Sequence, residues 1–227
     1  MLVKNRPANQ KSKRRKLPEN KFEILQMEPR FTNSVLVTAG RDCVIFDAWG
    51  RAEDWIKLLD SRGLKLRAIY ATHGHSDHIS AVPGLAAHYN VPWFLNSRDV
   101  PLILWGNQIL DFWELPRIPD DFVAPHDLHA GKTKILNDIE MEIIASPGHS
   151  LGGVMFYFPE YKILLTGDTI FRDGVGRTDL PGGDEKQLNE SIANLGRMNL
   201  PNDTYIVHGH GPDSMIGWLK QNHPFFK

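Results

Sequence analysis

Short apolar runs separated by turn residues begin at residue 21 and continue to the end of the chain. The first runs, FEILQM, SVLVTA and CVIFDAW, are rich in β-branched and aromatic side chains and predict a meander of strands. Residues 51–63 place apolar side chains at near-helical spacing and end in Gly63, which predicts a helix. The runs LKLRAIYAT and VPWFLN predict further strands, with a helix over AVPGLAAHYN between them.

The second half repeats this order. The runs KILN, MEIIAS, GVMFYF and YKILLTG predict strands, and residues 184–198 predict a helix with Leu188, Ile192 and Leu195 on one face. TYIV predicts a last strand and DSMIGWLKQ a last short helix. The irregular, aromatic-rich segment 98–125 is either a lid or partner surface, or a helix packed on the core.

Two similar halves indicate an α+β fold. We predict a four-layer αββα sandwich, in which two mixed β-sheets pack face to face and helices flank them. Side chains at the strand ends of both halves would then meet along one edge. Residues 21–227 are predicted to form a single domain. Residues 1–20 are predicted to be a basic, disordered tail, because they are charged, polar and poor in aliphatic side chains.

Charge and cysteine content narrow the function classes. Residues 1–20 carry seven basic side chains against one acidic, so the rest of the chain is acidic although the net charge is −1. An acidic body argues against a nucleic-acid binder, but KSKRRK within the tail leaves open a solvated extension or an arm for RNA or an acidic partner. We expect no membrane partner, because no apolar stretch approaches the roughly 20 residues that span a bilayer. The single cysteine, Cys43, excludes an internal disulfide and favours a reducing, cytoplasmic compartment. The oligomeric state is not indicated.

The stretch THGHSDH at residues 72–78 concentrates candidate metal ligands. It contains His73, His75, Asp77 and His78. Imidazole and carboxylate groups are preferred ligands of zinc and of other divalent cations. Buried groups of this kind would otherwise each need a hydrogen-bond partner. The stretch therefore predicts a metal site whose remaining ligands come from elsewhere in the chain.

Three further candidates each follow a predicted strand: His149, Asp168 and His210. Loops at strand ends are where sites are usually built, and neighbouring glycines allow tight backbone geometry. Seven ligands are more than one tetrahedral zinc ion can bind, so we divide them into two sites. The first site takes His73, His75 and His149. The second takes Asp77, His78 and His210, and Asp168 bridges both ions.

In this order the motifs resemble those of the metallo-β-lactamase-fold hydrolases. The resemblance rests on H-x-H-x-D-H at residues 73–78, then SPGHS, LLTGDT and GHGP, and it covers residues 22–227. GDTIFRDGVGRTDLPGGD and GHGPDSMIGWLKQNHPFF are most similar to the small, single-domain glyoxalase II-like branch, that of hydroxyacylglutathione hydrolase-like enzymes. The resemblance implies two divalent ions, zinc with iron or manganese as alternatives. It also implies that hydroxide held between the ions cleaves a small-molecule thioester or related ester.

The resemblance also implies roles for single residues. Asp77 would orient the nucleophile as well as bind metal, which makes it the candidate catalytic residue. Arg177, in GVGRTD, would hold a substrate carboxylate by bidentate contact. The alternative for Arg177 is a structural brace paired with Asp179 or Asp173.

Some positions depart from the family pattern. His208 stands where the family usually has proline, and it is either a histidine that does not bind metal or a competing ligand. DAWG at residues 47–50 alters the usual turn after Asp47. Leu219 and His223 stand where a glutamate and an asparagine are common. The changes at Leu219 and His223 bear on the substrate rather than on the metal site.

Other activities of the same fold remain as alternatives. A persulfide dioxygenase would hold one iron with His73, His149 and Asp168, and the ligand list alone does not separate it from a dinuclear hydrolase. A nuclease is less consistent with the acidic body. A β-lactamase is disfavoured because the familiar zinc enzymes use a cysteine in the role that Asp168 fills here.

Overall fold

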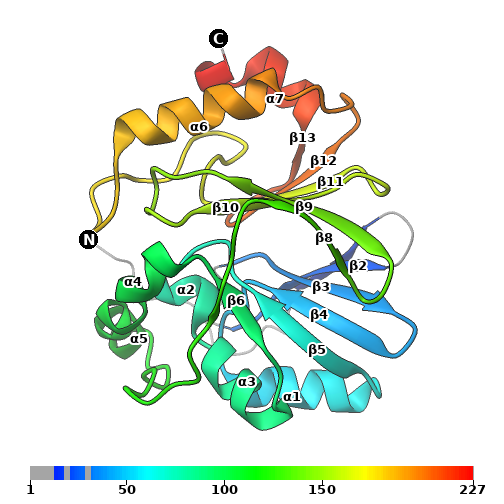
Figure 1. Cartoon of the computed structure of the whole chain (residues 1–227), viewed down its shortest axis with the longest axis vertical. Coiled ribbons are helices and arrows are strands. Elements are labelled where there is room, and N and C mark those ends of the chain that lie inside the picture. Colours follow the sequence, from blue (N-terminus) through cyan, green and yellow to red (C-terminus); the bar gives the residue numbers. More distant parts are fainter. Residues whose placement is uncertain (1–12, 18–20, 29–31, 227) are drawn as a thin grey trace.

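The computed structural model describes residues 13–17, 21–28 and 32–226. Two β-sheets lie face to face, and helices cover the outer face of each (Figure 1). The predicted αββα sandwich is therefore confirmed. Among the described residues, no helix is both long enough and apolar enough to cross a membrane.

Among the described residues, the first sheet has seven strands in sequence order. The pairings from β1 to β4 are antiparallel and those from β4 to β7 are parallel, so the sheet is mixed. Its strands are β1 (Lys13–Lys16), β2 (Phe22–Gln26), β3 (Ser34–Ala39), β4 (Asp42–Phe46), β5 (Lys65–Tyr70), β6 (Trp93–Leu95) and β7 (His126–Asp127).

Within the part of the chain that the structure describes, the second sheet has six strands in the order β13-β12-β11-β10-β9-β8. Its one parallel pairing among the described strands joins β11 to β12. The strands are β8 (Gly131–Ile135), β9 (Ile139–Ala145), β10 (Val154–Phe158), β11 (Ile163–Gly167), β12 (Tyr205–His208) and β13 (Ser214–Met215).

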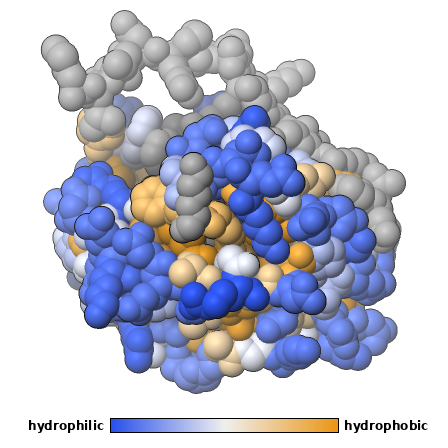
Figure 2. All heavy atoms as spheres, turned by 90° about the horizontal axis from the view of Figure 1, so that it is seen from above, coloured by the Kyte–Doolittle hydropathy of each residue, from blue (hydrophilic) through white to orange (hydrophobic). Residues whose placement is uncertain are grey.

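Helices cover the sheets on the outside. On the first sheet lie α1 (Ala52–Ser61), α3 (Val82–Tyr89), α4 (Val100–Trp105) and α5 (Asn107–Phe112), with the short α2 (Ser76–Ile79) and the 3₁₀ turn η1 (Ser97–Asp99) beside them. On the second sheet lie α6 (Glu185–Arg197), α7 (Ile216–Asn222) and the 3₁₀ turn η2 (Pro224–Phe226). The face that carries α6 and α7 shows hydrophobic residues surrounded by hydrophilic ones (Figure 2).

Two segments differ from or refine the sequence prediction. The composition predicts that residues 13–16 belong to a disordered tail, but they form β1, which pairs with β2, and Leu17 is buried between the sheets. The ladder of backbone hydrogen bonds outweighs the polar composition there. The rest of the predicted tail lies outside the described residues. Segment 98–125 forms α4 and α5, whose Ile103 and Leu110 are fully buried, so the helical alternative applies.

Aromatic side chains fill the space between the sheets. Phe46 of β4 meets Phe156 of β10 edge to face, with ring centroids 4.9 Å apart, and Phe22 meets Phe158 in the same way at 4.9 Å. Because side chains alternate along a strand, β10 turns Phe156 toward the first sheet and Tyr157 toward α6. This packing fixes the two sheets, and therefore the loops at their ends, relative to one another.

We predict that Phe156→Ala lowers the free energy of unfolding by about 3–5 kcal/mol, because it opens a cavity between the sheets. Denaturant unfolding of the metal-free protein, with chelator present, measures this without a contribution from bound metal. Phe112→Ala is the control, because that ring is 43% exposed and its loss is expected to cost about 0.5 kcal/mol or less. Equal effects of the two variants would contradict this account of the core.

Candidate metal centre

Asp47 orders the start of the histidine stretch. It follows β4, its φ is +53°, and its carboxylate accepts hydrogen bonds from the backbone nitrogen of Thr72 at 2.7 Å and from Thr72 Oγ1 at 2.8 Å. Its Oδ2 also lies 3.0 Å from Nδ1 of His78. Aspartate tolerates the left-handed region better than most residues, so the altered turn DAWG still delivers this carboxylate.

The first cluster consists of His73, His75 and His149, whose nearest ring nitrogens all lie within 4.8 Å of one another. All three side chains are buried. Nδ1 of His149 donates to the carbonyl of Arg177 at 2.7 Å, and Nδ1 of His73 lies 3.0 Å from Thr72 Oγ1. A proton on Nδ1 of His149 leaves its Nε2 as a lone pair that faces the cluster.

The second cluster consists of Asp77, His78 and His210. Nε2 of His210 lies 3.2 Å from Oδ2 of Asp77 and 3.3 Å from Nε2 of His78. Asp77 and His210 are partly exposed, whereas His78 is fully buried. This cluster therefore faces the surface more than the first one does.

Asp168 lies between the two clusters. Its Oδ2 is 3.5 Å from Nε2 of His149 and 3.3 Å from Nε2 of His210, and its Oδ1 is 3.3 Å from Nε2 of His78. Gly209 makes room for it, because a Cβ at that position would lie 2.0 Å from Oδ1. One carboxylate thus contacts ligands of both candidate sites.

The donor atoms fit divalent cations. Within the described residues, Nε2 of His73, Nε2 of His75 and Oδ1 of Asp168 are buried without a hydrogen-bond partner. The facing nitrogens of His75 and His149 lie only 2.9 Å apart. Buried polar atoms without partners are costly, and a cation that accepts their lone pairs would remove that cost. The clusters are therefore suited to metal ions.

The pKa shifts of the clustered histidines are also consistent with a site for cations. Burial lowers the pKa of His75 to about 4, and burial together with the neighbouring imidazoles holds the pKa of His73 well below its usual value. Burial also lowers the pKa of His78 and His210, but the carboxylates, above all Asp168, outweigh it and raise these values to about 10 and about 11. In the absence of metal, the carboxylates thus retain protons on these two rings.

The structure brings together all seven ligands predicted from the sequence: His73, His75, Asp77, His78, His149, Asp168 and His210. The guanidinium of Arg177 does not join them. It is exposed and forms a bidentate ion pair with Asp179, with both hydrogen bonds at 2.6 Å. Of the two roles considered for Arg177, the paired brace is present, and its partner is Asp179.

His208 lies outside both clusters. It is fully buried, and its Nδ1 donates to the carbonyl of Ile170 at 2.6 Å while its Nε2 lies 2.7 Å from Ser214 Oγ. His223 donates in a similar way to the carbonyl of Gly174 at 3.1 Å. Both rings therefore fasten the loop that follows Asp168.

Sequence reasoning missed two buried residues near the ligands, Asp99 and Asn33. Asp99 is fully buried in η1, and Asn33 is 3% exposed just before β3. Their partners are backbone groups of the ligand loops, far away along the chain. No motif signals such contacts, because any loop can supply a backbone N–H or C=O.

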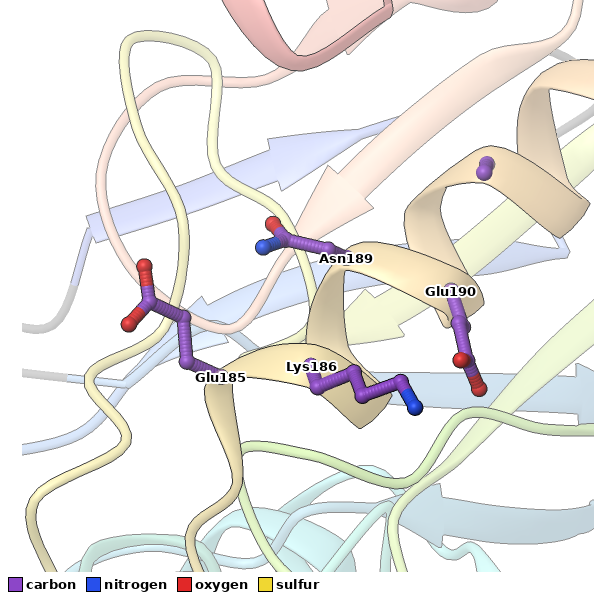
Figure 3. Close-up of a pocket in the computed structure, with 5 residues that line it drawn as sticks. Glu185, Lys186, Asn189 and Glu190 are labelled. Atoms are coloured by element: carbon purple, nitrogen blue, oxygen red, sulfur yellow. The ribbon is translucent and has the colours of Figure 1, made fainter.

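A hollow of about 450 Å³ lies beside α6 and is lined by none of the candidate ligands. Figure 3 shows its lining side chains spreading outward along one helix rather than converging on a point; the lining residues are Glu185, Lys186, Asn189, Glu190 and Ala193. It offers no constellation of groups comparable to the histidine clusters. We therefore assign the chemistry to the clusters.

Comparison with known proteins agrees with this geometry. Residues 27–210 match the family model described as the metallo-beta-lactamase superfamily. The hydroxyacylglutathione hydrolase GloC of Haemophilus influenzae is 34% identical over 187 residues, which cover 82% of this chain and 87% of that protein. The probable metallo-hydrolase YqgX of Bacillus subtilis is 29% identical over 209 residues, covering 90% of this chain and 97% of that protein.

A solved structure with similar architecture is TTHA1623 in a di-iron-bound form. It has a TM-score of 0.78 and 34% identity, with 89% of this chain and 98% of that one covered. The family model spans most of the chain, the fold is shared, and the candidate ligands meet in one place. The chain therefore belongs to the metallo-beta-lactamase superfamily and is a metallo-hydrolase of that superfamily.

Proposed function

We propose that this protein hydrolyses a small-molecule thioester or a related ester, using two divalent cations held by the two clusters. The observation that carries the proposal is the single carboxylate, Asp168, in contact with histidines of both clusters. The relationship to GloC favours a hydroxyacyl thioester of glutathione as substrate. A glutathione thioester suits a reducing, cytoplasmic compartment, which the single buried cysteine also favours.

We assign the first ion to His73, His75 and His149, the second to Asp77, His78 and His210, and Asp168 to both. When bound, such ions would polarise a carbonyl oxygen and lower the pKa of water toward neutrality. Zinc suits this donor set best, and iron and manganese are the alternatives.

Asp77 is the proposed catalytic residue of the chain itself. Its carboxylate is partly exposed in the second cluster and can accept a hydrogen bond from the attacking water, which fixes the direction of attack. A thiolate leaving group has a modest pKa and needs no strong general acid. The site accordingly requires one orienting carboxylate rather than an acid–base pair.

Arg177 is proposed to hold a substrate carboxylate at the mouth of the site. Its backbone carbonyl accepts the hydrogen bond from His149, so the backbone of this residue lies beside the first cluster. A substrate carboxylate would have to displace Asp179 from it. Because this pair is exposed to solvent, its exchange costs little.

β-Lactam hydrolysis is a second candidate. The structure of the BLEG-1 B3 metallo-beta-lactamase has a TM-score of 0.80 and 30% identity, covering 91% of this chain and 99% of that one. The mononuclear iron dioxygenase alternative predicts oxygen consumption instead. β-Lactam hydrolysis and oxygen consumption should therefore be measured beside thioester hydrolysis.

Purified protein loaded with zinc is expected to hydrolyse a hydroxyacyl thioester of glutathione faster than a β-lactam. His149→Ala is expected to lose most of that activity and one bound ion while keeping its secondary structure, because it removes a ligand and no core packing. Thiol release, elemental analysis and circular dichroism measure these three properties. Full activity in His149→Ala, or oxygen uptake with a glutathione persulfide, would contradict the proposal.

Metal uptake is expected to release protons. His78 and His210 carry a proton at neutral pH in the metal-free protein, because their pKa values are about 10 and about 11. Raising the pH weakens proton competition, so affinity at the second cluster rises by about tenfold per pH unit for each proton released. Calorimetric titration with metal, in buffers of different ionisation enthalpy, measures the number of protons released for each ion bound. Uptake of two ions without proton release would contradict the assignment.

Arg177→Ala is expected to raise KM by about 10- to 100-fold for a thioester that carries a carboxylate, as for loss of a hydrogen bond to a charged group. The value of kcat should change little, because the contact persists from substrate to transition state. Asp179→Asn should lower KM, because it frees the guanidinium. Arg172→Ala is the control, since Arg172 lies over Trp218 instead. An unchanged KM in Arg177→Ala would exclude the clamp.

A further inference from the structure

Two sets of buried polar side chains tie the ligand loops together. One is the carboxylate of Asp99, which is fully buried. The other is the pair Thr32 and Asn33, which are 0% and 3% exposed. Each set bonds to backbone or hydroxyl groups next to the ligands of one cluster.

Asp99 joins the two loops of the first cluster. Its Oδ2 accepts hydrogen bonds from the backbone nitrogen of Gly74 at 3.0 Å and from Ser150 Oγ at 2.7 Å, and its Oδ1 accepts from the backbone nitrogen of Gly152 at 2.6 Å. Gly74 lies between two ligands, and Ser150 directly follows a third. One carboxylate thus fixes the spacing between the 73–75 loop and the loop of His149.

Glycines on both sides allow this close approach. A Cβ at position 74 would lie 2.6 Å from the backbone oxygen of Asp99, and a Cβ at position 152 would lie 2.9 Å from its carboxylate. Any other residue at these positions would push the loops away from Asp99. The sequence therefore accommodates the carboxylate from both loops.

Thr32 and Asn33 do the same for the second cluster. Nδ2 of Asn33 donates to the carbonyls of His208 at 2.9 Å and Gly211 at 3.0 Å, on either side of His210. Its backbone nitrogen donates to the carbonyl of Gly209 at 2.8 Å. Thr32 Oγ1 donates to the carbonyl of Asp77 at 2.6 Å. This segment therefore joins the loops of Asp77 and His210.

We infer that these are positioning residues with separate duties: Asp99 sets the ion site of His73, His75 and His149, and Thr32 with Asn33 sets that of Asp77, His78 and His210. The inference rests on the proposed function in that it requires two ions. It goes further in assigning each ion its own support, so that either site can be weakened alone. Support of metal ligands of this indirect kind is typically worth 10- to 100-fold in affinity.

The test uses two variants for each site. Asp99→Asn keeps the shape but turns an amide N–H toward a hydrogen-bond donor, and Ser150→Ala removes one donor. Asn33→Ala removes both side-chain bonds to the loop of His210, and Thr32→Val removes the bond to Asp77. Asp203→Asn is the control, because Asp203 pairs with Lys162 at the surface and with no ligand loop.

Zinc titration of chelator-stripped protein, in competition with a chromophoric chelator, measures the two dissociation constants. We expect each variant to raise the dissociation constant of one ion by about 10- to 100-fold and to leave that of the other within about threefold of wild type. The control should match wild type. Thermal unfolding of the metal-free proteins checks that they fold; if Asp99→Asn or Asn33→Ala does not, the milder variant of the same site carries the test.

Double variants identify the weakened site. Adding Asp99→Asn to His149→Ala should change the affinity for the remaining ion little. Adding it to His210→Ala should lower the affinity for the remaining ion. Asn33→Ala should show the reverse pattern. If either variant lowers the affinity for both ions equally, or lowers neither, the inference is overturned and the proposed function is left intact. A wild-type protein that binds fewer than two ions overturns both.

Discussion

The cost of burying charged and unpaired polar groups is the constraint on which this structure depends. Imidazoles and carboxylates from distant parts of the chain share one largely buried pocket, with Asp168 between them. Such a pocket is unfavourable unless positive charge enters it, either as ring protons or as cations. The carboxylates raise the pKa of His78 and His210, so that protons on these rings supply the positive charge when metal is absent.

The fold delivers these groups because strand ends are rigid and loops after them are short. Packing of β4 against β10 fixes the sheets, and the parallel pair β11–β12 places Gly167 beside His208, so that Asp168 and His210 leave neighbouring strands together. A backbone hydrogen bond from Val154 to Thr72 links the sheets directly next to the histidine stretch. Small movements of either sheet would therefore change the distances within the clusters.

Substrate specificity is not determined by the scaffold alone. Related folds include a hydroxyacylglutathione hydrolase, a di-iron protein and a β-lactamase, so the scaffold alone does not choose the reaction. In the loop after Asp168, backbone carbonyls accept hydrogen bonds from His208 and His223, and Arg177 is paired with Asp179. Specificity is expected to depend on how a substrate competes for that arginine.

The sequence by itself predicted the layered fold class and the candidate ligands, because periodicity and ordered histidine and aspartate motifs are local signals. Tertiary structure alone decided that residues 13–16 join the first sheet, that His208 turns away from the clusters, and that Arg177 pairs with Asp179. It also decided that Asp99 and Asn33 hold the ligand loops. These contacts run between side chains and the backbone, or between exposed charges. Many sequences could supply either partner, so their pairing depends on which segments the packed sheets bring within reach.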